Sequence, residues 1–229
     1  MLAVTFLIGV FGFGFPGVQS SAEIQVAKKQ KSVPQLTVNN EKKTEKTTRD
    51  EYDYLGLASK ELNIKVLEPK GTMRGVEATQ LVEASFKDML LTLTDYDKFD
   101  QYMPNVDRSK TVKEEKGQKW VDTELDFGLF GVEYVLKMDA SIDLASKKAK
   151  ISWVRDSGEM KQIKGSWWIQ EKDSFVAVKY ESFLDPGLSI PGWIQDRLTK
   201  GAVPDLFEAI AERSKKNSLS RKSGSEHKK

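Results

Sequence analysis

The chain has 229 residues, of which 39% are hydrophobic and 31% are charged, an ordinary balance for a globular domain with appendages. It carries 36 Lys and Arg against 34 Asp and Glu, so its net charge does not indicate a nucleic-acid partner. It contains no cysteine, and its one histidine, His227, lies in a polar C-terminal stretch. These counts exclude disulfides, cysteine-ligated metals and thiol nucleophiles, and they argue against histidine-based catalysis or metal binding.

The N-terminal stretch is strongly apolar. Residues 2–18 are almost entirely apolar, and the small residues SSA precede Glu23, which predicts a signal peptide over residues 1–22. Glycines and a proline interrupt the stretch, and it is slightly short for a bilayer span, so a weak membrane anchor over residues 2–18 is the alternative. Both interpretations place the folded part outside the cytoplasm, in the periplasm or secreted.

Two polar stretches flank the expected domain. Residues 23–58 are rich in Lys, Thr, Asn, Gln and Glu and cannot bury enough apolar surface to offset chain ordering, so we expect a disordered linker. Residues 217–229 form a basic stretch that we expect to be a disordered tail. The folded domain is therefore expected over residues 59–216.

The domain begins with two alternating stretches, 62–68 and 73–84, which predict two strands joined by a Pro-Lys-Gly turn. Ser85 is placed to cap a short helix, and a second short helix follows over 96–103. Further strands are predicted, in order, over residues 105–115, 118–128, 131–144, 149–158, 160–171 and 174–184.

A long helix closes the domain after Pro191. It carries an apolar residue at every fourth position, namely Ile194, Leu198, Ala202, Leu206 and Ile210. Pro204 removes one backbone hydrogen bond and is expected to kink the helix. This order predicts an α+β fold in which a curved antiparallel sheet packs on the C-terminal helix, with two short helices after the first strands.

Three segments of the domain resemble a known superfamily. LTDYDKFDQYMPNVDRSKTV resembles its aspartate–aromatic–Met-Pro segment, ISWVRDSG with IKGSWWIQ resembles its paired tryptophan strands, and YESFLDPGLSIPGWIQDRLTKGAVPDLFEAI resembles its last strand and helix. On these segments the chain resembles the START-like (SRPBCC, helix-grip) superfamily, which includes polyketide cyclases, coenzyme-Q-binding proteins and START lipid-binding domains. The resemblance implies a helix-grip fold. It also implies a cavity between the sheet and the last helix that holds a hydrophobic ligand such as a lipid, sterol or quinone-like molecule.

The adjacent tryptophans Trp167 and Trp168 must point to opposite faces of their strand. Apolar residues share the phase of Trp167 and polar residues share that of Trp168, so we expect Trp167 inside and Trp168 outside, covered by lysine side chains. Gly165 leaves room beside the inner residues, which suits either a sharp bend in the sheet or the close approach of a ligand.

The inward phase of the strands and the last helix gives a set of candidate ligand contacts. Arg155 shares the predicted phase of Trp153, so it would bind a polar head group, pair with a carboxylate such as Asp126, or reach the rim of the cavity and be solvated. The complete predicted set is Tyr134, Met138, Trp153, Arg155, Trp167, Tyr180, Trp193, Ile194 and Leu198. The alternative is that the aromatic residues, with Trp120, fill a solid core.

Two glycine-containing segments are candidate gates. Phe127, Leu129 and Phe130 lie at a predicted hairpin, where they would cover the cavity, touch a membrane transiently or pack on the domain's own helix. Gly187 and Gly192 precede the last helix and are able to absorb a change in backbone conformation.

The sequence offers no recognisable catalytic set. Asp122, Glu124 and Asp126 alternate along one strand as its solvent face. We therefore predict no metal, no cofactor and no enzyme activity. The leading hypothesis is a monomeric extracytoplasmic START-like domain that binds or carries a hydrophobic small molecule or lipid. The alternatives are a cavity enzyme of the polyketide cyclase or isomerase type and an envelope protein-interaction module.

Overall fold

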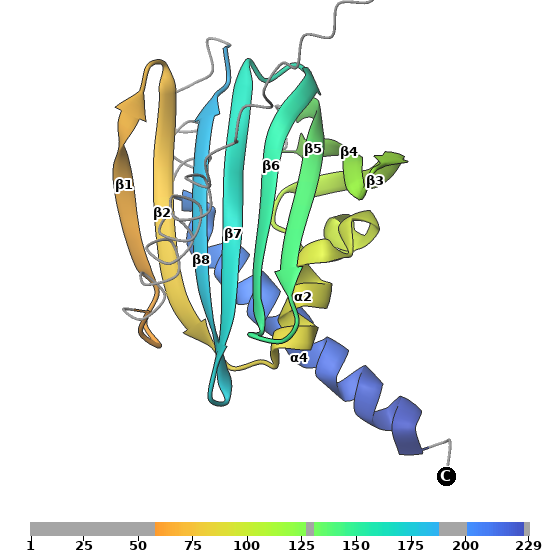
Figure 1. Cartoon of the computed structure of the whole chain (residues 1–229). Coiled ribbons are helices and arrows are strands. Elements are labelled where there is room, and N and C mark those ends of the chain that lie inside the picture. Colours follow the sequence, from red (N-terminus) through yellow and green to blue (C-terminus); the bar gives the residue numbers. More distant parts are fainter. Residues whose placement is uncertain (1–57, 127–130, 188–200, 227–229) are drawn as a thin grey trace, which may run out of the picture. The chain divides into compact units, whose positions relative to one another are not determined.

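The computed structural model describes residues 58–126, 131–187 and 201–226. Within these residues, eight strands form one antiparallel sheet in the order β1-β2-β8-β7-β6-β5-β4-β3 (Figure 1). Strands β3 to β8 follow one another as a meander, and the β1–β2 hairpin pairs with β8. The strands are β1 Asn63–Lys70, β2 Met73–Val82, β3 Val106–Glu115, β4 Gln118–Asp126, β5 Gly131–Asp143, β6 Lys148–Gly158, β7 Gln162–Lys172 and β8 Phe175–Asp185.

Three helices accompany the sheet in the described part of the chain: α2 (Phe86–Thr94), the 3-10 helix η2 (Tyr96–Gln101) and α4 (Val203–Glu226). The hydroxyl oxygen of Ser85 accepts a hydrogen bond from the backbone N–H of Asp88 at 3.2 Å, so Ser85 is the N-cap that the sequence predicted. Helices α2 and η2 lie between β2 and β3, which confirms the prediction of two short helices after the first strands.

The main core lies between one face of the sheet and helices α2 and α4. Alternate side chains such as Trp167 on β7 and Val178 on β8 are buried on this face, because neighbours along a strand point to opposite sides. Helix α4 contributes Val203, Phe207 and Ile210 to the same cluster, and Figure 1 shows it running diagonally behind strands β8 to β5. The predicted α+β fold, a curved antiparallel sheet with a C-terminal helix, is confirmed.

Helix α4 corrects one detail of the sequence analysis. It continues to Glu226, although residues 217–229 were expected to be a disordered tail. Its polar side chains Asn217 and Arg221 hydrogen bond to α2, so tertiary contacts stabilise a helix that composition alone does not predict. Pro204 is the second residue of α4, and residues 188–200 lie outside the described chain, so the predicted kink stays a prediction.

The N-terminal features lie outside the described residues. These are the predicted signal peptide or anchor over residues 1–22 and almost all of the predicted linker, since the described chain begins at Ala58. Among the residues that are described, no helix has the length and apolar composition that a membrane span requires.

Candidate functional site

A cavity of about 190 Å³ lies between the sheet, η2 and the beginning of α4. Strands β4 to β8 supply most of its wall, η2 and the turn after it supply a second side, and α4 supplies a third. The lining residues are Tyr96, Phe99, Met103, Pro104, Asn105, Val106, Val121, Thr123, Leu125, Tyr134, Leu136, Met138, Trp153, Met160, Ile163, Trp167, Tyr180, Ser182, Leu184, Ala202, Val203 and Leu206. The gap between the sheet and the helix is therefore only partly filled by side chains.

An aromatic cluster forms the floor of the cavity. Trp167 and Tyr180 are directly opposite each other on β7 and β8, and their ring centroids are 4.5 Å apart. Trp153 on β6 stacks on Tyr180 at 5.8 Å with an interplanar angle of 25°. The ring of Phe207 on α4 lies 5.8 Å from Trp167, so the cluster joins the sheet to the helix. Such ring pairs fix orientation beyond what apolar burial alone would do.

Gly165 explains how Trp153 reaches across the neighbouring strand. The two residues are opposite each other on β6 and β7. A Cβ atom on Gly165 would lie 2.3 Å from Cζ2 of Trp153 and 2.3 Å from the backbone oxygen of Glu181. The space that the sequence left open for a bend or a ligand is thus occupied by an indole ring.

Hydroxyl groups interrupt the apolar wall. Thr123 and Tyr134 are opposite each other on β4 and β5, and Tyr180 hydrogen bonds with Ser182 on β8. Burial raises the pKa of Tyr134, and the nearby Tyr180 raises it further. Burial also raises the pKa of Tyr180, against the opposing effect of the Ser182 hydrogen bond. Both phenols therefore stay protonated at neutral pH and remain available to donate hydrogen bonds.

The described lining contains no Asp, Glu, Lys, Arg or His. A third aromatic hydroxyl, that of Tyr96, has its pKa raised to about 12 by burial, so it is neutral as well. Among the described residues there is also no group of three acidic, histidine or cysteine side chains that would hold a metal ion. The described part of the cavity wall is consequently uncharged, and its polar chemistry is that of hydroxyl and amide groups.

The cavity brings together five of the predicted ligand contacts, namely Tyr134, Met138, Trp153, Trp167 and Tyr180. Arg155 is not among the lining residues. Its side chain turns along β6, and Nη2 donates a hydrogen bond to the backbone oxygen of Gly158 at 2.7 Å. The pairing of β5 with β6 shifts register beside Arg155, between Val135 and Leu136, which alternation along a single strand cannot reveal. Arg155 pairs with the lining residue Leu136 and therefore lies beside the cavity, and its predicted head-group role stays a prediction.

Comparisons with known proteins agree with this geometry. Residues 82–211 match the family model described as polyketide cyclase / dehydrase and lipid transport. The chain belongs to this family. The matched segment extends from the end of β2 to α4 and includes every strand of the cavity wall. No curated protein has a sequence that matches the chain.

Solved structures show the same fold at low sequence identity. A STAR-related lipid transfer protein from Xanthomonas axonopodis is 17% identical, with a TM-score of 0.58 over 67% of this chain and 93% of that one. Human STARD10 is 9% identical, with a TM-score of 0.55 over 72% of this chain and 78% of that one. A START superfamily protein from Mycobacterium smegmatis is 14% identical, with a TM-score of 0.51 over 62% and 97%. The predicted START-like resemblance is confirmed.

Seven of the remaining predicted residues fall outside the described parts of this family fold. They are the last-helix contacts Trp193, Ile194 and Leu198 and the gate residues Phe127, Leu129, Phe130 and Gly192. The other gate residue, Gly187, follows β8 with a positive φ of 69°. Its backbone N–H donates to Oδ1 of Asp185 at 2.9 Å, and Nζ of Lys161 lies 3.1 Å from Oδ2 of the same carboxylate. Asp185 and its hydrogen bond thus hold Gly187 in place at the end of β8.

Two tryptophans lie on the outer face of the sheet. Trp168 faces outward as predicted and is only 4% exposed, with Nζ of Lys150 and of Lys179 each 5.0 Å from its ring. Trp120 is also on the outer face, so it is not one of the interior rings that the solid-core alternative included. Its indole N–H donates to Asp156 at 2.9 Å. The inner face of β4 is formed instead by residues that include Thr123.

Sequence analysis missed several lining residues. Thr123 and Ser182 are small polar side chains in the inward phase of their strands, and alternation would have found them if polar residues had been admitted to the interior. Phe99 lies in η2, and Met160 lies just before β7, since the predicted strand 160–171 begins two residues too early. Strand alternation places neither residue, because it applies only within a strand.

Proposed function

We propose that the domain is a carrier that binds a neutral hydrophobic molecule with a flat ring, such as a sterol-like or quinone-like compound or the ring of a lipid. The observation that carries this proposal is the uncharged cavity wall, in which the rings of Trp153, Trp167 and Tyr180 lie beside the hydroxyl groups of Tyr134 and Ser182. Rings offer flat apolar contact, and hydroxyls offer hydrogen bonds to a carbonyl or hydroxyl of the ligand.

The size of the cavity limits the ligand that fits without rearrangement. A cavity of about 150 Å³ is enough to hold benzene, whereas drug-sized ligands occupy pockets of about 300–1,000 Å³. The 190 Å³ found here suits one ring system or a short alkyl segment. A complete sterol or phospholipid would require the wall to move, and α4 and η2 with the turn after it are the parts of the wall that are not strands of the sheet.

A cyclase-like enzyme is the second candidate, because the family description includes polyketide cyclases and dehydrases. Such chemistry needs a group that accepts or donates a proton near neutral pH. The described cavity offers tyrosine hydroxyls whose pKa is raised, such as Tyr134, and these are poor bases. The carrier is therefore the better-supported function. The proposed location is extracytoplasmic, and transient contact with a membrane would let a carrier load its ligand.

Two probes with the same ring test the proposal. Titration of the protein with 1-naphthol and with 1-naphthoate, followed by tryptophan fluorescence, compares a neutral and an anionic naphthalene. We expect 1-naphthol to bind at least about tenfold more tightly, since an unpaired carboxylate is costly in an uncharged cavity. Trp167→Ala should weaken 1-naphthol binding strongly, while the control Trp120→Phe on the outer face should leave it unchanged. Equal binding of both probes, or unchanged binding by Trp167→Ala, would overturn the proposal.

A further inference from the structure

One stripe of helix α4 changes from apolar to polar along its length. The stripe follows helical spacing of three and four residues and consists of Val203, Phe207, Ile210, Ser214, Asn217 and Arg221. Its first three members belong to the main core. Its last three lie beyond residue 211, where the match to the family model ends. The polar half therefore lies outside the segment that the family model matches.

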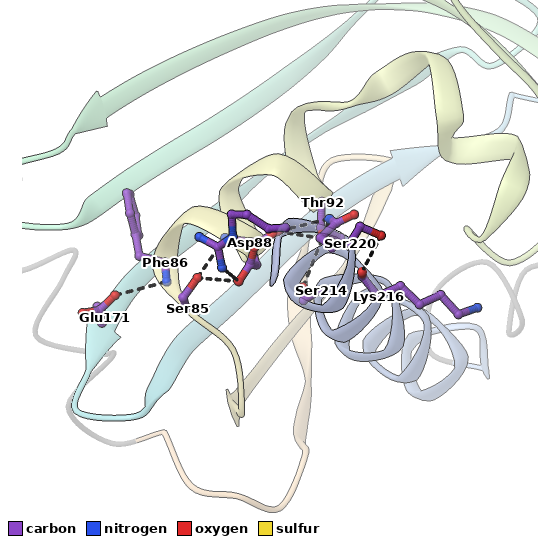
Figure 2. Close-up of polar contacts among 10 residues, drawn as sticks. Ser85, Phe86, Asp88, Thr92, Glu171, Ser214, Lys216 and Ser220 are labelled. Carbon is purple, nitrogen blue, oxygen red and sulfur yellow. Dashed lines mark hydrogen bonds and ion pairs between the residues drawn. The ribbon is translucent and has the colours of Figure 1, made fainter. Parts of the chain in front are cut away.

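The polar half of the stripe binds helix α2. Oγ of Ser214, which is fully buried, lies 3.1 Å from Oγ1 of Thr92, and Nδ2 of Asn217 donates to the same Thr92 oxygen at 3.0 Å. One turn further, Nη2 of Arg221 lies 2.5 Å from Oδ2 of Asp88. Figure 2 shows Asp88 and Thr92 of α2 facing Ser214 of α4. We call these five residues the polar clamp.

Asp88 is the centre of the polar clamp. Its side chain is 4% exposed, whereas that of Arg221 is 45% exposed. The hydroxyl of Ser85 lies 2.6 Å from Oδ2 of Asp88, so the carboxylate is also held by the N-cap of α2. A buried carboxylate is costly without a cation, and a bond from a guanidinium to it has a strict geometry. The pair therefore favours one position of α4 along α2.

Helix α2 is itself fixed to the sheet. Its first residue, Phe86, donates its backbone N–H to Oε2 of Glu171 at 3.1 Å (Figure 2). Glu171 also pairs with Lys147. Because α2 is bonded to β7, the contact of Arg221 with α2 also fixes the position of α4 relative to that strand. Leu206, which lines the cavity, is 15 residues before Arg221, or about 22 Å along the same rigid helix.

We infer that the polar clamp is a positioning device for the cavity wall: Asp88 and Arg221 set the register of α4 on α2, which holds Ala202, Val203 and Leu206 in place and slows ligand exchange. The apolar half of the stripe has no contacts of this kind, because the burial of apolar groups is non-directional. The part of the inference that concerns ligand exchange rests on the carrier function proposed above, and the part that concerns helix position does not.

The test separates these two parts. Amide hydrogen exchange over residues 202–210 is measured without ligand, and the dissociation rate of 1-naphthol is measured by stopped-flow fluorescence. Arg221→Met should raise both rates at least about tenfold, because it leaves Asp88 without its cation. Arg221→Lys should restore most of the protection. Lys216→Ala, which removes a cation from the same helix without a clamp contact, should change neither rate more than about twofold.

A general loss of stability must be distinguished from a change in helix position. Phe183→Leu, in a buried site on the outer face of the sheet, serves as a destabilised control that does not touch α4. In this variant the amide exchange over residues 202–210, relative to that of the rest of the domain, should stay close to wild type.

If Arg221→Met does not fold, a second variant replaces it. Thr92→Val with Ser214→Ala removes the neutral part of the polar clamp while the ion pair remains, and it should raise both rates by a smaller factor.

Unchanged protection of residues 202–210 in Arg221→Met, or in the double variant when Arg221→Met does not fold, would overturn the inference. Faster amide exchange together with no binding of 1-naphthol to the wild-type protein would refute the carrier function and leave the positioning role of the polar clamp standing. Faster amide exchange with an unchanged 1-naphthol dissociation rate would show that the clamp positions α4 without controlling ligand exchange, and would overturn that part.

Discussion

Gly165→Ala is the substitution for which the structure allows the most detailed prediction. The added Cβ would lie 2.3 Å from the indole of Trp153 and 2.3 Å from the backbone oxygen of Glu181. The indole is able to rotate away, although it would lose its stacking on Tyr180. The carbonyl oxygen belongs to β8 in the middle of the sheet and has little freedom. Overpacking of a well-filled site costs about 1–3 kcal/mol, and the fixed carbonyl puts Gly165→Ala at the upper end, about 3 kcal/mol.

Urea unfolding followed by far-ultraviolet circular dichroism measures this loss. With a slope of about 2–3 kcal/mol per M, a loss of about 3 kcal/mol lowers the midpoint by about 1–1.5 M. Gly117→Ala is the matched control, since a Cβ there meets nothing within 4 Å and only its φ of 79° is unfavourable. It should cost about 1 kcal/mol.

The contact between Gly165 and Trp153 has a second consequence. The indole of Trp153 is one of the two groups with which the added Cβ would clash. The double variant Gly165→Ala with Trp153→Leu should therefore lose less stability than the sum of the losses in the two single variants. A loss below about 1 kcal/mol for Gly165→Ala, or strict additivity of the two changes, would refute the account of how Trp153 reaches across β7.

Three further predictions concern charge, hydrogen bonding and capping. The pKa of Asp185 is lowered, first by the hydrogen bond from the Thr72 hydroxyl, so its folded pKa lies below the unfolded one. The resulting stabilisation is present above about pH 4 and is lost as the pH falls through the folded pKa. Asp185→Asn should therefore flatten this part of the stability profile in urea titrations from pH 6 to pH 3. Tyr134→Phe removes one hydroxyl from the cavity wall and should weaken 1-naphthol binding about two- to tenfold in fluorescence titration, with little change in unfolding free energy. Ser85→Ala removes the N-cap of α2 and should cost about 1 kcal/mol in urea unfolding, whereas an unchanged midpoint would contradict the capping role.

Strand alternation predicted much of the site. It placed Trp167 inside and Trp168 outside from their neighbours alone, because the period of two leaves no other choice once one face is apolar. The same rule would have placed Trp120 outside, since it shares the phase of Asp122 and Glu124. The solid-core alternative nevertheless counted Trp120 among the interior rings, whereas in the structure Lys113 and Lys137 cover its ring as lysines cover Trp168.

Other features required the three-dimensional structure. The register shift beside Arg155 depends on how β5 pairs with β6, and no pattern within β6 reveals it. The polar end of α4 reads as a disordered tail because its composition is polar, yet Ser214 is fully buried against Thr92 of α2. A partner that is 122 positions away in the sequence satisfies that hydroxyl, and such contacts are invisible to local composition.

The central claim is that the domain holds a neutral hydrophobic ligand between the sheet and α4. Native mass spectrometry of residues 23–229, purified without detergent and compared before and after organic extraction, tests it most directly. The account predicts a discrete neutral adduct that extraction removes and that Trp167→Ala lacks, while the outer-face variant Trp120→Phe retains it. A mass that matches the bare chain, and that stays unchanged after incubation with sterol, quinone and lipid mixtures, would contradict it.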